Sequence, residues 1–391
     1  MRTILLGAGA SVEAKVPTAK KMVELIYWHF RHFDGRISDA MQTAIGGLKL
    51  HRSVECAEPF DEVDIEDVYE TLRLLGSRES NLLSPFVGSW SHAIQRAERP
   101  ELHQAVNGVA VEIAEMTRDA LARFADQASK SSYLYLNHEP ISRSLSHALL
   151  FACGRGESAF SSAADEVLTQ IVDRTWIDDP SRVGYLEKLV TSSENEPLWI
   201  ASLNFDNTIE LAAKQATLTV DLGIRAGEPS IRFDEESRIS LAKLHGSVTW
   251  SYDESGRITV AQEKVPSPAM IFGSGNKLRI EGPYLDLLFA FRERLERSEE
   301  VWVCGYSFRD QHINYLLLGW LQAADGRKLC VFDPCLSIAD IERNLSAAMP
   351  RGWQLIAGNL KGRVDLEKLY AGDWVRRYFG EQSCRPQKVD S

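Results

Sequence analysis

Short apolar runs recur through the C-terminal half of the chain, and one more opens the sequence. They lie at residues 2–6, 198–203, 239–244, 269–272, 301–304 and 328–332. Between several of them, apolar residues follow the three-and-four spacing of a helix, at residues 207–215, 284–297, 312–323 and 337–348. Continuous apolar strands that alternate with helices predict an α/β fold, with a parallel sheet covered on both faces.

Helical patterning dominates residues 19–196. Apolar stripes at helical spacing lie at residues 19–33, 61–75, 101–128, 139–152 and 163–176. Breaks are predicted at Gly46-Gly47, Glu58-Pro59, Arg99-Pro100 and Asp179-Pro180. We therefore predict that residues 19–196 form a large α-helical subdomain, inserted into a domain made of residues 1–18 and 197–379. The polar residues 380–391 are expected to be a disordered tail.

A glycine turn follows the first apolar run. Gly7-Ala8-Gly9-Ala10-Ser11 comes directly after residues 2–6, and a helix-forming stretch opens after Pro17-Thr18. Strand, glycine turn and helix can together bring backbone N–H groups against a pyrophosphate. The third glycine of the dinucleotide fingerprint is replaced by Val12, and no acidic residue closes a second strand about twenty residues on. An ordinary tight turn between strand and helix is therefore the alternative interpretation.

Polar or glycine residues end each of the longer apolar runs. Besides the first turn, these ends are Asn204-Phe205-Asp206, His245-Gly246-Ser247, Gly305-Tyr306-Ser307 and Asp333-Pro334. In open parallel sheets the ligand crevice lies just beyond the carboxyl ends of the strands. The sequence therefore predicts that five strand ends with Asn, Asp, His, Ser and Gly side chains converge on one cleft.

Composition narrows the class of protein. The 391 residues include 44 Lys and Arg against 55 Asp and Glu, a net charge of −11, so we expect no direct nucleic-acid binding. Six cysteines contain no CxxC pair, which argues against a zinc site and a secreted disulfide framework. The first apolar run is too short for a signal peptide, and no window reaches the length of a membrane span. We expect a cytoplasmic protein without a membrane segment.

These motifs, in this order, resemble the sirtuin-like family. The resemblance rests on GAGAS followed by PT, NFD at residues 204–206, LHGS at residues 244–247 and GYSFRDQHIN at residues 305–314. It is closest to the NAD-consuming, sirtuin-like effectors of bacterial antiphage defence. It covers about half the chain, leaves the helical block outside, and implies a Rossmann-like sheet that binds NAD⁺ as a substrate.

The resemblance assigns roles by position. Asn204 matches the catalytic asparagine, which positions the nicotinamide ribose and the attacking water, and His245 matches the catalytic histidine. Asp206 matches an acidic residue on the nicotinamide side, and Asp333 is placed near the adenosine ribose hydroxyls. The remaining predicted NAD-binding residues are Gly7, Ala8, Gly9, Ala10, Ser11, Pro17, Thr18, Gly305, Ser307 and Asp310.

Structural alternatives stay open for several of these residues. A histidine after an apolar strand is often a satisfied core residue, and Asn204 can serve as a turn cap. Asp310, His312 and Asn314 can form a helix N-cap and first turn instead of contacting a ligand. For catalysis, His245 offers a base that titrates near neutrality, while the positively charged nicotinamide needs little general acid.

The chain departs from the protein-deacylating sirtuins at two places. It lacks their zinc module of two CxxC pairs, and it has Val16-Pro17-Thr18-Ala19 where they carry Pro-Asp-Phe-Arg. Both departures remove parts associated with an acyl-lysine peptide, so the resemblance favours an NAD⁺ hydrolase that releases nicotinamide and ADP-ribose and depletes NAD⁺ in abortive antiphage defence. Cyclisation of ADP-ribose stays open as an outcome.

Two other functions remain alternatives at this stage. One is protein deacylation or ADP-ribosyl transfer on the same fold, and the other is a non-catalytic module that senses NAD⁺ or ADP-ribose. We also expect a homo-oligomer in which the helical block mediates assembly or docking. By family analogy, the expected partner is a HerA-type ATPase, with a short Argonaute as the alternative.

Overall fold

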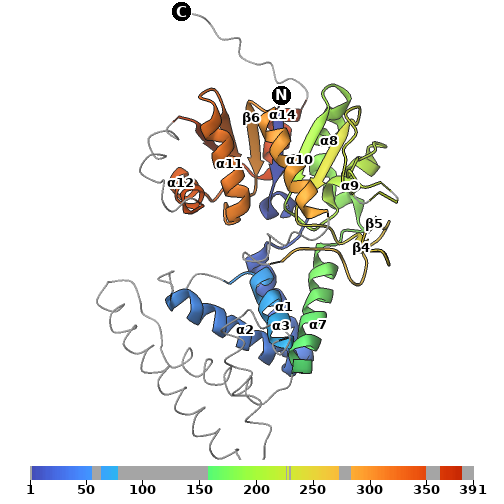
Figure 1. The fold of residues 1–391 in the computed structure, drawn as a ribbon, viewed down its shortest axis with the longest axis vertical. Coiled ribbons are helices and arrows are strands. Elements are labelled where there is room, and N and C mark those ends of the chain that lie inside the picture. Colours follow the sequence, from blue (N-terminus) through green and yellow to red (C-terminus); the bar gives the residue numbers. More distant parts are fainter. Residues whose placement is uncertain are drawn as a thin grey trace, which may run out of the picture. The chain divides into compact units, whose positions relative to one another are not determined.

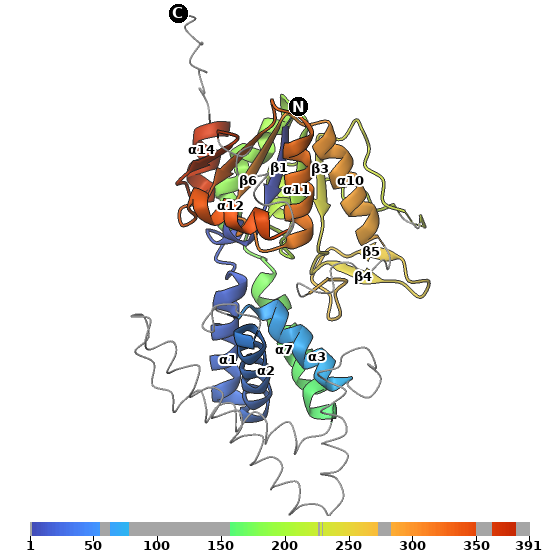
Figure 2. The ribbon, with the colours of Figure 1, turned by 60° about the vertical axis from the view of Figure 1, so that its left-hand side comes forward.

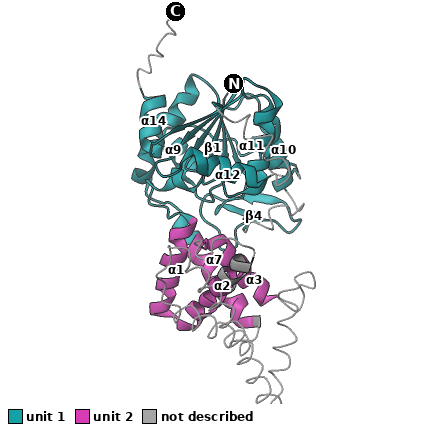
Figure 3. Cartoon of the chain, turned by 90° about the vertical axis from the view of Figure 1, so that its left-hand side faces the viewer, with its two compact units in different colours: residues 1–18, 172–391 teal, residues 19–171 magenta. Residues whose placement is uncertain are grey.

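The computed structural model of the chain describes residues 2–54, 63–77, 157–225, 227–228, 230–272, 283–348 and 362–380. The chain divides into two compact units, drawn in different colours in Figure 3. One unit combines Met1–Thr18 with Val172–Ser391, and the other is Ala19–Ile171. A helical segment is thus inserted between the first strand and the rest of the sheet.

A parallel sheet forms the centre of the first unit (Figure 1). Among the described residues it has six strands in the order β3-β2-β1-β6-β7-β8, and every neighbouring pair is parallel. The strands are β1 (Arg2–Leu6), β2 (Leu198–Ser202), β3 (Ile239–Lys243), β6 (Glu300–Cys304), β7 (Lys328–Phe332) and β8 (Val364–Glu367). The predicted α/β class and its parallel sheet are confirmed.

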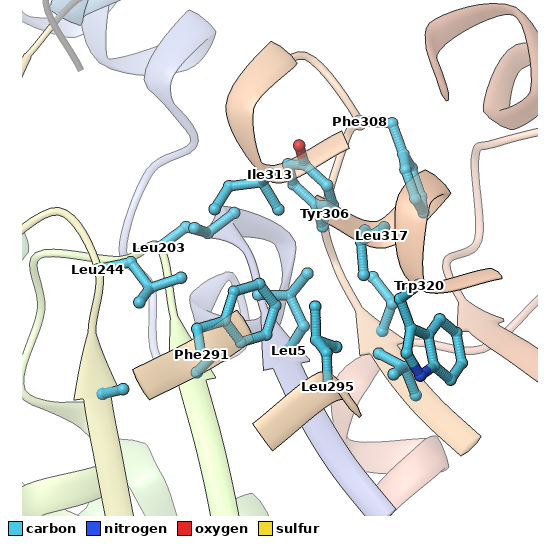
Figure 4. Close-up of a cluster of buried hydrophobic side chains, with 14 of the residues drawn as sticks. Leu5, Leu203, Leu244, Phe291, Leu295, Tyr306, Phe308, Ile313, Leu317 and Trp320 are labelled. Atoms are coloured by element: carbon cyan, nitrogen blue, oxygen red, sulfur yellow. The ribbon is translucent and has the colours of Figure 1, made fainter. Parts of the chain in front are cut away.

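Helices cover both faces of this sheet (Figure 2). One face packs against α10 (Tyr284–Glu296), α11 (Gln311–Ala323) and α12 (Ile338–Ala347). The other packs against η3 (Pro180–Leu186), α8 (Glu187–Thr191), α9 (Thr208–Gln215) and α14 (Ala371–Phe379), with the short η4 (Ser192–Glu194) following α8. Side chains alternate along each strand, so Leu5 joins the first core and its neighbours Ile4 and Leu6 join the second. Figure 4 shows the first core, where Leu5 lies among side chains from α10 and α11.

Two parts of the sheet region differ from the prediction. Residues 269–272 form no sheet strand, because Met270 makes only an isolated antiparallel bridge with Gly246, beyond the end of β3. A hairpin of β4 (Trp250–Tyr252) and β5 (Ile258–Val260) was not predicted, and neither was β8. These strands have only three or four residues and partly exposed side chains, so no continuous apolar run marks them.

The second unit is helical in its described part. It contains α1 (Ala19–Phe33), α2 (Gly35–Val54), α3 (Ile65–Gly76) and most of α7 (Glu157–Thr175). In α1 the buried side chains are Met22, Ile26 and Phe30, which is the predicted stripe. The predicted break at Gly46-Gly47 is wrong, because α2 runs through it while packed against α1 and α3. The stripes at 101–128 and 139–152 and the tail at 381–391 lie outside the described residues.

The boundary between the units also differs from the predicted one at residue 196. Residues 172–196 belong to the unit that contains the sheet. Ile177, Val183 and Leu186 are buried in the core that contains the β2 residue Ile200, which explains why these helical turns stay with the sheet. None of the helices within the described ranges is long and apolar enough to cross a membrane.

Candidate active site

The carboxyl ends of five strands carry the predicted site residues along one edge of the sheet. In strand order, β3 leads to His245, β2 to Asn204, β1 to Gly7, β6 to Gly305 and β7 to Asp333. With about 4.8 Å between neighbouring strands, this row spans roughly 19 Å. A ligand that touches both ends of this row must therefore be an extended molecule. Asn204 and His245 lie at one end of the row.

The two glycine turns interlock. The Gly7 N–H donates to the Cys304 carbonyl at 3.0 Å, and the Gly9 N–H donates to the Gly305 carbonyl at 2.8 Å. A Cβ atom on Gly7 would lie 2.6 Å from the Gly305 oxygen. Gly305 itself has a φ of +66°, and a Cβ there would lie 2.2 Å from the Ala10 nitrogen. Close approach of the two turns therefore accounts for glycine at all three positions.

The turn after β1 continues as a short 3-10 helix, η1 (Ala8–Ser11). The long helix α1 begins only at Ala19, so the predicted helix N-terminus does not directly follow the glycines. Ala8 is exposed and Gly9 half-buried, whereas Ala10 is buried and its carbonyl accepts a 2.7 Å bond from the Tyr185 hydroxyl. Pro17 and Thr18 are half-buried at the end of the same segment.

Asn204 connects the end of β2 to this turn. Its Nδ2 donates to the Gly7 carbonyl at 2.9 Å and to the Ser11 Oγ at 3.0 Å. The Gly7 carbonyl can only accept, so this bond fixes which end of the side chain is the NH₂ group. Ser11 is 1% exposed, which makes it a support for Asn204 in this arrangement. Both amide hydrogens are used, and no described residue donates a hydrogen bond to the Asn204 Oδ1, so this oxygen can accept one from a ligand.

Both ring nitrogens of His245 contact an oxygen atom. Its Nδ1 lies 3.2 Å from the Leu203 carbonyl oxygen, and its Nε2 lies 3.0 Å from the Asp310 Oδ2. His245 and Asp310 are 6% and 8% exposed, so little water reaches the pair. Asp310, which was predicted among the NAD-binding residues, contacts the predicted catalytic histidine in the structure.

These contacts constrain how a ligand can reach the His245 ring. A carbonyl oxygen cannot donate, so the ring is the donor at Nδ1. The other nitrogen, Nε2, faces the Asp310 carboxylate, and a substrate group that binds Nε2 must first replace Asp310 there.

Asp310 also caps a helix. Its Oδ1 accepts bonds from the N–H groups of His312 at 2.9 Å and Ile313 at 3.3 Å, at the start of α11. Asp310 is therefore the N-cap of α11, and one carboxylate serves the helix and the histidine together. Asn314 donates to the Phe308 carbonyl at 2.7 Å and accepts from the Tyr306 hydroxyl at 2.9 Å. These bonds hold the loop between β6 and α11.

The predicted acid Asp206 lies in the turn between β2 and α9. Its Oδ1 accepts from the backbone N–H of Thr208 at 3.0 Å and from the Thr208 hydroxyl at 2.7 Å, and the residue is 4% exposed. These are the bonds of a turn-capping aspartate. The structure therefore shows a structural task for Asp206, close to Asn204 in the chain.

The remaining predicted residues lie toward the other end of the row. Ser307 is exposed, and its backbone carbonyl accepts a 3.2 Å bond from Asn344 of α12. The Oδ1 of Asp333 accepts from the N–H groups of Cys335 at 2.8 Å and Leu336 at 2.9 Å. Asp333 thus shapes its own turn, four strands away from His245.

Three residues that the sequence analysis did not single out support the site. Tyr185 and Arg182 of η3 bind the Ala10 and Ala14 carbonyls, each at 2.7 Å. Burial and the neighbouring carboxylate of Asp206 raise the pKa of Tyr185, so its hydroxyl stays a neutral donor. The third residue, Lys243 on β3, is 1% exposed. A lysine within the apolar run at residues 239–244 was the signal that could have marked it.

Part of the chain is similar to a known protein family. Residues 199–349 match the model of the SIR2-like domain. No curated protein matches the chain significantly. Among solved structures, the chain resembles a Sir2 homologue in complex with NAD, at 15% identity and a TM-score of 0.34, over 56% of this chain and 72% of the other.

Two further solved structures have similar values. A mutant Sir2 homologue in complex with 2′-O-acetyl ADP-ribose matches at 15% identity and a TM-score of 0.34, over 58% of this chain and 80% of the other. A mutant Sir2 homologue in complex with ADP-ribose matches at 14% identity and a TM-score of 0.35, over 56% and 74%.

Proposed function

We propose that this protein cleaves the bond between nicotinamide and ribose in NAD⁺ and transfers the ADP-ribose group to water. The observation that carries the proposal is the arrangement of Asn204 and the His245–Asp310 pair. They stand at the ends of neighbouring strands, beside the glycine turn to which Asn204 is bonded. The match of residues 199–349 to the SIR2-like domain supports the choice of NAD⁺ as the substrate.

Cleavage of the nicotinamide–ribose bond depends more on how the site orients the ribose and water than on acid catalysis. When the glycosidic bond breaks, its electron pair leaves with the positively charged nicotinamide, which becomes neutral, and the ribose passes through an oxocarbenium-like state. The leaving group therefore needs no proton. The site must hold the ribose, position a water molecule on its C1′ atom, and accept the proton that this water loses.

Asn204 is suited to the first two tasks. Its two N–H groups are tied to Gly7 and Ser11, so the direction of Oδ1 is set before a ligand arrives. An oriented acceptor can bind a ribose hydroxyl or the attacking water without reorganisation, which is the main advantage of a preorganised site.

His245 and Asp310 are suited to the proton step. In the reaction, water adds its oxygen to C1′ and one proton leaves, so NAD⁺ and water give nicotinamide, ADP-ribose and a proton. We assign that proton to His245 after the bound ribose has replaced Asp310 at Nε2. The adjacent carboxylate then stabilises the charged ring.

The proposal is tested by incubating the protein with NAD⁺ and measuring free nicotinamide and ADP-ribose in equal amounts. Nicotinamide release that persists in both the Asn204→Ala and the His245→Ala variant contradicts the catalytic roles assigned to these residues. A labelled NAD⁺ that modifies a protein acceptor, with little free ADP-ribose, supports ADP-ribosyl transfer instead, and loss of acyl groups from a peptide supports deacylation. Binding of NAD⁺ without turnover in every assembly state supports a sensing module.

We further propose, from the resemblance of the motifs, that the activity serves as an effector of antiphage defence and is switched on by a partner. A HerA-type ATPase is the preferred partner and a short Argonaute the alternative. The helical unit, residues 19–171, is proposed to mediate assembly. Native mass spectrometry of the full chain and of a variant without this unit tests the point, because an unchanged oligomeric mass contradicts it.

A further inference from the structure

Lys243 places a charged group in the core between sheet and helix. It is the last residue of the edge strand β3, and its alternation with Ile239 and Leu241 turns it toward the face covered by α9. The side chain is 1% exposed, so its stem and its ammonium group are both shielded from water. A buried lysine of this kind requires bonds that repay its loss of water.

The ammonium group reaches the turn that contains Asn204. Its Nζ donates to the carbonyl oxygen of Asp206 and to the carboxylate of Glu210, at 3.0 Å for the Glu210 Oε1, and lies 3.5 Å from the Phe205 carbonyl. Glu210 stands in the first turn of α9. The ammonium group of Lys243 thus joins the end of β3, the Asn204–Asp206 turn and the start of α9.

Stability alone does not explain this arrangement. An apolar side chain of similar length fills such a site about as well as a buried ion pair, because the pair must repay the cost of desolvating two charges. The Glu210 Oε2 is also buried without a hydrogen-bond partner in the described part of the chain, so the pair is incompletely satisfied. A methionine lacks the donors that Lys243 offers to the turn carbonyls.

We propose that Lys243 is a positioning residue for the site, and that Glu210 keeps its ammonium group aimed at the turn. By holding the carbonyls of Phe205 and Asp206, Lys243 fixes the turn that follows Asn204. It therefore limits the freedom of the Asn204 side chain between Gly7 and Ser11. This inference rests on the proposed function only as far as its catalytic readout is concerned.

The test separates positioning from stability with Lys243→Met, Glu210→Gln and the double variant. Nicotinamide release per folded molecule, the urea midpoint, and hydrogen–deuterium exchange of residues 204–208 are measured for each. Lys264→Met is the matched control, since Lys264 forms an exposed ion pair with Asp173 in the same unit. It is expected to behave like the wild-type protein.

Lys243→Met is expected to lower the urea midpoint, because the partly buried Glu210 carboxylate then loses its charged partner. It is also expected to reduce release at least tenfold, because the turn carbonyls lose their donor. The double variant also removes the Glu210 charge, so its midpoint recovers while release stays low and residues 204–208 exchange faster. Glu210→Gln keeps the lysine donors and most of the release. Recovery of release together with the midpoint in the double variant overturns the proposal, and so does full activity of Lys243→Met.

The exchange measurement keeps the two proposals separate. If the wild-type protein releases no nicotinamide with any partner, the proposed function fails, and the exchange rates still decide the role of Lys243. Faster exchange of residues 204–208 in the stabilised double variant supports positioning of the turn. Unchanged exchange there overturns it.

Discussion

The Nδ2 of Asn204 donates to the Oγ of Ser11 at 3.0 Å, across 193 residues of sequence. This bond joins the glycine turn after the central strand to the end of the next strand. It uses an amide hydrogen of Asn204, so the Oδ1 is the atom that the proposed chemistry requires to accept a bond from the substrate or water.

Asn204→Ala is expected to reduce nicotinamide release about 10²–10³-fold, the usual effect of removing one preorganised polar group from an active site. Steady-state release measured on folded protein checks this. The matched control is Asn207→Ala, because Asn207 is also buried but binds only the backbone of Ile177, at 2.9 Å for both bonds. That control is expected to lose stability by about 1–3 kcal/mol and to lose much less of its turnover than Asn204→Ala. Equal loss of release in both variants contradicts a special role for Asn204.

Asp310→Asn is expected to lower release about 10²–10⁴-fold, because the group that contacts the His245 Nε2 at 3.0 Å loses its negative charge. Asparagine is a good N-cap, so α11 is expected to keep its stability, as measured by the urea midpoint. Asp64→Asn, at the N-cap of α3, makes the same change in the other unit and serves as the control. A normal turnover in Asp310→Asn removes the carboxylate from the mechanism.

Gly305→Ala is expected to destabilise the protein by about 2–4 kcal/mol, because φ is positive there and the new Cβ meets the Ala10 nitrogen. Urea unfolding measures this change. In contrast, Gly319→Ala adds a methyl group in open space on the exposed side of α11. It is expected to stabilise the helix by about 0.5–1 kcal/mol. Similar midpoints for the two variants would show that the turns do not interlock as described.

Two thiols are expected to resist alkylation of the native protein at pH 8. Burial raises the pKa of Cys304, and burial raises that of Cys330 to about 11, so both remain protonated and unreactive. Cys335 is exposed and is expected to react first. Peptide mass spectrometry after brief iodoacetamide treatment distinguishes the three sites, with the urea-unfolded protein as the fully labelled reference. Labelling of Cys304 at the rate of Cys335 contradicts the buried position of β6.

Asp221→Asn is expected to destabilise the loop at residues 221–234. Burial raises the pKa of Asp221, but bonds from Arg225 and from the backbone of Asp234 and Gly223 outweigh it, so the net pKa is lowered. A lowered pKa stabilises the fold at pH values above the ordinary value of 3.8, and this contribution is lost as the pH falls below it. Urea unfolding of both proteins between pH 7 and pH 3 checks this. A difference that is constant over the whole range contradicts the assignment.

Much of the sheet was predictable from the sequence because its central strands are buried on both faces. The strands β1, β2, β3, β6 and β7 each appear as a continuous apolar run, and the helices between them show helical spacing. The edge strand β8 and the hairpin β4–β5 lack this signal because they are short, contain polar residues and are only partly buried. A glycine pair suggested a break in α2, where packing against neighbouring helices overrides the local propensity.

For the candidate site, the sequence predicts which residues take part but not which partners they contact. Polar strand ends identified Asn204 and His245, but partners that come from distant segments leave no local pattern. The pairing of His245 with Asp310 depends on how the loop before α11 returns to β3, and the support from Tyr185 depends on residues predicted to belong to the inserted block. These contacts are set by tertiary packing, which periodicity does not encode.

The central place of β1 has a consequence for how the chain folds during synthesis. β1 pairs with β2 and β6, whose residues follow it by nearly two hundred and three hundred positions. At 5–20 residues per second, the ribosome needs on the order of 15–60 s to deliver β6 after β1. For all that time the first strand of the nascent chain has no completed sheet to enter. Folding of this unit is therefore a late event in translation, and a chaperone that shields residues 2–6 is expected to raise the yield of native protein.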